Sequence, residues 1–127
     1  MSEGEYISLG WFERDDLNII VEYLRKEKKI STIGLWGRSM GAVTALLHAD
    51  RDPGIAGIVL DSPFSDLKVL VNELAKTHTK IPSFLVSGAL KLVRSSISSK
   101  AKFDIFKLAP INHVQHSFIP ALFAHGL

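Results

Sequence analysis

One short run in this chain has the residue types and spacing that nucleophilic catalysis requires: Gly37-Arg38-Ser39-Met40-Gly41. A serine hydroxyl forms a covalent acyl intermediate when a base activates it and nearby donors stabilise the oxyanion. The Gly-x-Ser-x-Gly pattern is typical of a nucleophile elbow, a sharp strand-to-helix turn that lifts the hydroxyl above the sheet. We therefore predict that Ser39 is a nucleophile. The backbone amide of Met40, at the start of the following helix, is the predicted oxyanion donor.

The two glycines of the run fit this prediction. Crowding between strand and helix is expected to leave no room for side chains at Gly37 and Gly41. Two other interpretations stay open: a glycine-rich turn without a catalytic role, and a phosphate-binding loop. The Lys-Ser/Thr pair of a phosphate-binding loop is missing, which weighs against a nucleotide site. The sequence predicts no cofactor and no metal.

Alternating helix and strand patterns surround the run and must position it. Apolar spacing predicts helices over Asp15–Lys28, Met40–Ala49, Asp66–Lys76 and Ser83–Ser98, and strands over Thr32–Trp36, Ile55–Leu60 and Ile119–Ala124. Ser65 is the expected N-cap of the third helix, and a further helical turn is expected over Phe103–Leu108. This order is typical of an α/β fold with a parallel sheet in one domain, residues 1–127. The long connection between the last two strands makes residues 79–102 a candidate cap or lid.

Composition excludes several other classes of protein. The 127 residues carry a net charge of +2 and 46% hydrophobic residues, which is ordinary for a globular domain. No cysteine is present, so disulfide and thiolate chemistry are excluded, and a cytoplasmic location is expected. The N-terminus lacks the apolar core of a signal peptide, and no apolar run is long enough to cross a membrane. The charge balance argues against nucleic acid, and the basic residues Lys91, Arg94, Lys100, Lys102 and Lys107 are interpreted as a solvated helix face.

The motifs together resemble one branch of the α/β-hydrolases. They are Tyr6–Trp11, Arg14–Asp16, Ile33–Ala42, Val59–Ser65 and Ile119–Gly126. The chain is similar to the serine aminopeptidase-like, Bem46-like hydrolases of plants and protists. The resemblance implies that the three strands correspond to the fifth, sixth and seventh of eight. It also implies that the second oxyanion donor, the usual triad Asp and the triad His lie outside these 127 residues, as expected for an internal part of a hydrolase.

The residues of this chain that could replace the missing triad acid and base are Asp61 and the histidines. Asp61 ends the strand beside the elbow strand and is a less favoured alternative acid; we favour an Asp61 side chain that is hydrogen-bonded with the turn Ser62-Pro63-Phe64-Ser65. Among the five histidines, His125 follows the last strand, where the resemblance implies a structural role. His113 and His116 have a spacing that suits a metal, but no neighbouring carboxylate or cysteine in the sequence completes a site.

The sequence therefore predicts a serine-hydrolase core that acts on a small acyl substrate, an ester, thioester or amide. Without its base the isolated chain is expected to be inactive. The segment Pro82–Lys102 is expected either to line an acyl pocket or to be plain core. A non-catalytic α/β module that acts in protein interaction is the rival, and binding to a lipid surface through Leu85–Lys102 is a third possibility. Exposed sheet edges and faces predict self-association of the chain.

Overall fold

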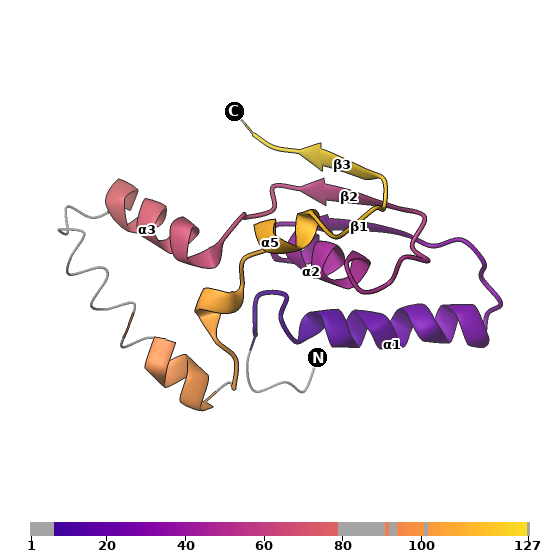
Figure 1. The fold of residues 1–127 in the computed structure, drawn as a ribbon, viewed down its shortest axis with the longest axis horizontal. Helices are drawn as coiled ribbons and strands as arrows, with labels where there is room; N and C mark the ends of the chain where they lie inside the picture. Colours follow the sequence, from indigo (N-terminus) through magenta and orange to yellow (C-terminus); the bar gives the residue numbers. More distant parts are fainter. Residues whose placement is uncertain (1–6, 79–90, 92–93, 101, 127) are drawn as a thin grey trace. The chain divides into compact units, whose positions relative to one another are not determined.

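The computed structural model describes residues 7–78, 91, 94–100 and 102–126, which form two compact units (Figure 1). Unit 1 comprises residues up to Phe64 and from Pro110 onward; unit 2 is Ser65–Ala109, inserted between two strands of unit 1. Most of the proposed lid, residues 79–102, lies outside the described residues. No helix among the described residues is long and apolar enough to cross a membrane.

Unit 1 is built on a parallel sheet of three strands in the order β1-β2-β3. The strands are β1 (Gly34–Arg38), β2 (Gly57–Asp61) and β3 (Ala121–Ala124). The register sets Arg38 opposite Asp61 and Asp61 opposite Ala124, so the carboxyl ends of all three strands meet at one edge. The parallel sheet expected from the sequence is confirmed, with each strand beginning two residues later than predicted.

Two helices lie on the same side of this sheet, as Figure 1 shows: α1 (Glu13–Lys26) and α2 (Met40–Ala49). In α1 the acidic residues gather in the first turn and Arg25 and Lys26 in the last, which complements the helix dipole. In α2 seven of the ten residues are buried, because small and apolar side chains let it pack between α1 and the strands. Near its C-terminal end, α2 also contacts the short helix α5 (Ile111–Val114).

The core of unit 1 lies between this helical layer and the sheet. Its buried members are Val21, Ile33, Ala42, Ala45, Leu46, Ala49, Ile55, Ile58 and Leu60. Burial of this apolar surface is the main force that holds the layers together, at about 25 cal/mol per Å².

The opposite face of the sheet is open. Because paired residues of a parallel sheet point to the same side, Trp36, Val59 and Leu122 share one face. Trp36 is 81% exposed and Leu122 63% exposed. No described helix of unit 1 covers these three residues, whereas a parallel sheet is normally covered on both faces.

Ion pairs fasten the C-terminal end of α2 to its neighbours. Asp52 pairs with Arg25 of α1 at 2.7 Å, and Asp50 pairs with the His113 ring of α5 at 2.7 Å. Arg51 pairs with Asp15 of α1 at 2.8 Å. These contacts join residues far apart in the chain and hold α1, α2 and α5 as one layer.

Unit 2 contains α3 (Leu67–His78), a helical stretch at residues 94–100 and the 3₁₀ turn η1 (Ile105–Lys107). The expected cap of α3 was wrong by one residue. The Asp66 carboxylate accepts hydrogen bonds from the amides of Lys68 and Val69, at 2.7 and 3.2 Å. A carboxylate satisfies these free amides and also complements the helix dipole, so Asp66 rather than Ser65 is the N-cap.

Unit 2 has buried apolar residues of its own. They are Leu67, Phe103, Ile105, Leu108 and Ala109. The amide of Leu67 donates to the Leu108 carbonyl at 3.1 Å, which joins the two ends of the inserted segment.

Candidate active site

Ser39 lies at the carboxyl edge of the sheet, between the end of β1 and the start of α2. Its backbone has φ 50° and ψ −115°, a region that residues other than glycine rarely adopt. Two hydrogen bonds hold it there: the Ser39 amide donates to the Asp61 carbonyl at 2.8 Å, and the Val43 amide donates to the Ser39 carbonyl at 3.1 Å. The residue is exposed, so a substrate can reach its hydroxyl.

The absence of a side chain at Gly37 is required by the turn. A Cβ atom there would lie 2.1 Å from the Gly41 carbonyl oxygen and 2.5 Å from the Ala42 amide nitrogen, both backbone atoms that cannot move aside. The same expectation for Gly41 was wrong, since an added Cβ at that position meets nothing within 4 Å. The close approach of β1 and α2 therefore requires glycine at Gly37, which the helix backbone contacts. It does not require glycine at Gly41, which faces outward.

The N-terminus of α2 points free amides toward the same edge. The first four N–H groups of a helix have no acceptor within the helix; in α2 that of Ser39 donates to the Asp61 carbonyl, and those of Met40, Gly41 and Ala42 have no hydrogen-bond partner among the described residues. The Met40 amide follows Ser39 directly. Its position at the positive end of the helix dipole suits it to stabilise a developing negative charge.

Asp61 occupies the neighbouring position on β2 and is already engaged. Its carboxylate accepts a hydrogen bond from the Ser62 hydroxyl at 2.9 Å, and the Nε atom of Arg38 lies 3.4 Å from its other oxygen. The hydrogen bond expected between Asp61 and the Ser62 turn is present. The contact with Arg38 was not expected from the sequence, because the pairing of β1 with β2 brings Arg38 to Asp61.

The histidines lie at different places. His125 follows β3 at the carboxyl edge, where it is exposed and its Nδ1 atom lies 2.7 Å from the Gly126 carbonyl. His48 is fully buried near the other end of α2, and burial lowers the pKa of its ring below the usual value against the opposing Asp52 carboxylate. Neither ring has a hydrogen bond to Ser39 or Asp61.

His113 has no carboxylate beside it in the sequence, but the fold brings one to it. His113 lies in α5 and contacts the Asp50 carboxylate, which is 63 residues away in the chain. Among the described residues, no group of three or more His, Asp or Glu is arranged to hold a metal ion. The pair fastens α5 to α2 and lies at the opposite end of α2 from Ser39.

A hollow of about 370 Å³ runs along the free edge of β1, beside the turn. It lies between α1, β1 and α2. Its lining is Glu13, Asp16, Leu17, Ile20, Gly34, Leu35, Trp36, Gly41, Thr44 and Ala45. The outward-facing Gly41 forms part of this wall, which explains why nothing meets an added Cβ there.

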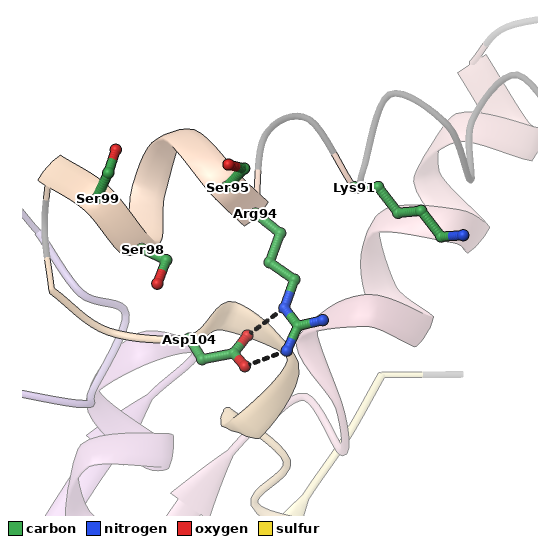
Figure 2. Close-up of a pocket in the computed structure, with 6 residues that line it drawn as sticks. All are labelled: Lys91, Arg94, Ser95, Ser98, Ser99 and Asp104. Atoms are coloured by element: carbon green, nitrogen blue, oxygen red, sulfur yellow. Dashed lines mark hydrogen bonds and ion pairs between the residues drawn. The ribbon is translucent and has the colours of Figure 1, made fainter.

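Unit 2 has a hollow of its own, of about 590 Å³, shown in Figure 2. The described residues that line it are Lys91, Arg94, Ser95, Ser98, Ser99 and Asp104. The Arg94 guanidinium binds the Asp104 carboxylate through both of its oxygens, which ties helical residues 94–100 to the segment before η1. This described part of Pro82–Lys102 therefore has a charged and hydroxyl-bearing wall. Most of the apolar residues expected to line an acyl pocket lie outside the described residues.

Comparison with known proteins identifies relatives of the whole arrangement. The model of the family described as serine aminopeptidase, S33, matches residues 12–115. The uncharacterized protein YqkD of Bacillus subtilis (strain 168) is 29% identical over 128 residues, which cover 98% of this chain and 41% of YqkD.

Solved structures give the same result for the fold. Two structures of the esterase Pf2001 of Pyrococcus furiosus match with TM-scores of 0.64 and 0.59, at 24% and 23% sequence identity. The match covers 94% of this chain and 42% of the esterase chain. The three parallel strands and their helices are thus part of an α/β-hydrolase fold, and the chain spans less than half the length of the relatives it matches.

Proposed function

Since this chain belongs to the serine aminopeptidase S33 family, we propose that it is the nucleophile-bearing part of a serine hydrolase. The reaction class is acyl transfer to water from a carboxylic ester, a thioester or an amide. The observation that supports this most is the backbone of Ser39, held at φ 50° between β1 and α2. Such strain persists only where the surrounding structure enforces it, and it is found most often at functional sites.

In this proposal the Ser39 hydroxyl attacks the acyl carbonyl, and the Met40 amide donates a hydrogen bond to the oxyanion that forms. The dipole of α2 favours the same charge, and one oxyanion donor contributes about 10²–10³ in rate. No cofactor or metal takes part.

Within the described residues, no histidine is hydrogen-bonded to Ser39, so this proposal assigns no general base among them. Asp61 is the alternative acid, but its carboxylate is already shared between Arg38 and Ser62, which leaves it poorly placed to orient a separate histidine. Without a base a serine hydroxyl is a weak nucleophile at neutral pH. We therefore expect the 127-residue chain by itself to show almost no turnover.

A fluorophosphonate probe tests the role of Ser39 in the native protein that contains these residues. We expect covalent labelling at Ser39, located by peptide mass spectrometry, and loss of labelling in Ser39→Ala. Ser31→Ala, in the exposed loop before β1, is the matched control and should label normally. Labelling at another residue, or none, would overturn the proposal. Turnover of p-nitrophenyl acetate by the 127-residue chain that disappears in Ser39→Ala would refute the expected inactivity.

The open face of the sheet favours a second candidate, a non-catalytic module that acts through protein contacts. Trp36, Val59 and Leu122 form an apolar surface of the kind that marks interaction sites. We infer that the 127-residue chain self-associates through this face at micromolar concentration. Sedimentation velocity should show dimers or larger species, reduced in Trp36→Glu. A monodisperse monomer would contradict self-association, and absence of Ser39 labelling in the native protein would favour the non-catalytic candidate.

A further inference from the structure

Three polar residues meet beside Ser39 at the carboxyl edge of the sheet, and we name Arg38, Asp61 and Ser62 the edge trio. The Arg38 Nε atom lies 3.4 Å from one Asp61 carboxylate oxygen. The Ser62 hydroxyl donates to the other oxygen at 2.9 Å. The Asp61 carbonyl accepts from the Ser39 amide at 2.8 Å, which couples the trio to the backbone of Ser39.

The backbone at Ser62 repeats the unusual conformation of Ser39. The two residues have φ 52° and φ 50°, and each follows one member of the paired positions Arg38 and Asp61. The Ser62 amide donates to the Ala124 carbonyl at 2.8 Å, so β3 holds this turn in place. Two strained serines at the same level of adjacent strands mark this edge as a place that the fold keeps rigid.

The Arg38 guanidinium has N–H groups that the contact with Asp61 does not use. The Arg38 side chain is 82% exposed, whereas Asp61 is 34% exposed. Asp61 contacts the guanidinium at Nε, and within the described residues the Nη1 and Nη2 groups have no other ion pair or hydrogen bond. The free Nη edge of a guanidinium matches the two oxygens of a carboxylate.

Two sources of positive potential therefore neighbour Ser39 in the chain. One is the exposed guanidinium of Arg38, and the other is the N-terminus of α2, whose first amides have no partner within the helix. The Asp61 charge is balanced by Arg38 and Ser62, so it orients the guanidinium without repelling a second anion strongly.

We infer that the edge trio is a subsite for a carboxylate carried by the acyl substrate. Arg38 binds the carboxylate through its Nη edge, and Asp61 and Ser62 are positioning residues that hold the guanidinium in place. The substrate class is then a half-ester, half-thioester or half-amide of a dicarboxylic acid. This inference rests on the proposed role of Ser39 and deepens it by assigning the substrate charge.

Two aryl esters of equal chain length test the inference in the native protein: the anionic mono-4-nitrophenyl glutarate and the neutral 4-nitrophenyl pentanoate. The readout is the ratio of their acylation rates, from the burst of nitrophenolate. Arg38→Met should lower the ratio of anionic to neutral ester by about tenfold, the effect of one charge-assisted contact. Ser62→Ala should lower this ratio by about two- to fivefold, because Asp61 loses a hydrogen bond and then holds the guanidinium less firmly. Arg51→Met removes a distant exposed cation and should leave the ratio unchanged.

A binding experiment needs no turnover and uses the 127-residue chain. Titration with glutarate should shift the ¹⁵N–¹H signal of Arg38 Nε, while the uncharged glutaramide should not. An unchanged ester ratio in Arg38→Met, or no shift with glutarate, overturns the inference. Normal acylation of Ser39 by the neutral ester in that case leaves the proposed function standing, whereas absence of acylation by either ester contradicts both.

Discussion

The two ends of α2 differ in how their polar groups are satisfied. At the N-terminal end Ser39 is strained, the backbone crowds Gly37, and helix amides remain free. At the C-terminal end Asp50 and Asp52 are paired with His113 and Arg25. The comparison suggests that the ion pairs and the buried core hold the helix firmly enough for its other end to stay strained and open, as functional sites often are.

The largest expected effect comes from crowding the N-terminal end. Gly37→Ala places a Cβ atom 2.1 Å from the Gly41 carbonyl oxygen, so β1 and α2 must separate. We expect a loss of at least about 3 kcal/mol in the free energy of unfolding, above the usual cost of overpacking because the clash is with backbone. Urea denaturation monitored by Trp fluorescence measures it.

Gly41→Ala is the matched control for that prediction. An added Cβ there meets nothing, and alanine is the better helix former, so stability should change by less than about 1 kcal/mol. Equal losses in the two variants would show that the close contact at Gly37 is not what sets this end of the helix.

Breaking the C-terminal end should have the next largest effect. Asp52→Ala removes the ion pair to Arg25 and the hydrogen bond from the Gly54 amide, and it leaves the guanidinium partly buried without its partner. We expect a loss of about 2–3 kcal/mol in the free energy of unfolding. If the ion pairs at the C-terminal end of α2 also stabilise the turn at Ser39, hydrogen exchange at the Met40 and Gly41 amides should become faster. Unchanged exchange would show that the two ends of α2 are stabilised independently.

Buried His48 should make stability depend on pH. Burial lowers its pKa in the folded state, opposed by Asp52 and assisted by Arg51. The unfolded ring, with its ordinary pKa near 6.5, then takes up a proton at a higher pH than the folded one. Stability should therefore be complete above about pH 6.5 and fall as the pH falls below it. His48→Gln should flatten the slope between pH 7 and 5, whereas His116→Gln, in an exposed segment, should keep it.

The smallest effect should come from the exposed pair at the same end. Asp15→Asn removes the contact to Arg51, in which both side chains are more than 40% exposed. Exposed pairs of this kind contribute less than about 0.5–1 kcal/mol. A loss as large as that of Asp52→Ala would mean that the whole charged network, rather than the buried pair, fastens α2.

Much of the fold could be predicted from local patterns. Helical spacing of apolar residues identified α1 and α2, and short apolar runs identified the three strands, because these signals come from neighbouring residues. The ends of helices and strands were predicted less accurately than their existence. The N-cap of α3 is Asp66 and not Ser65, because either of two adjacent polar residues can cap a helix. The Gly-x-Ser-x-Gly run similarly located the candidate site.

The sequence by itself determined the parallel α/β class, the turn at Ser39 and the need for glycine at Gly37. Tertiary structure decided that Gly41 is open, that Asp50 meets His113 across 63 residues, and that Arg38 of β1 meets Asp61 of β2. The physical reason is that these contacts depend on strand register and on the packing of separate elements. Both are set by burial of the common core, and no stretch of neighbouring residues encodes them.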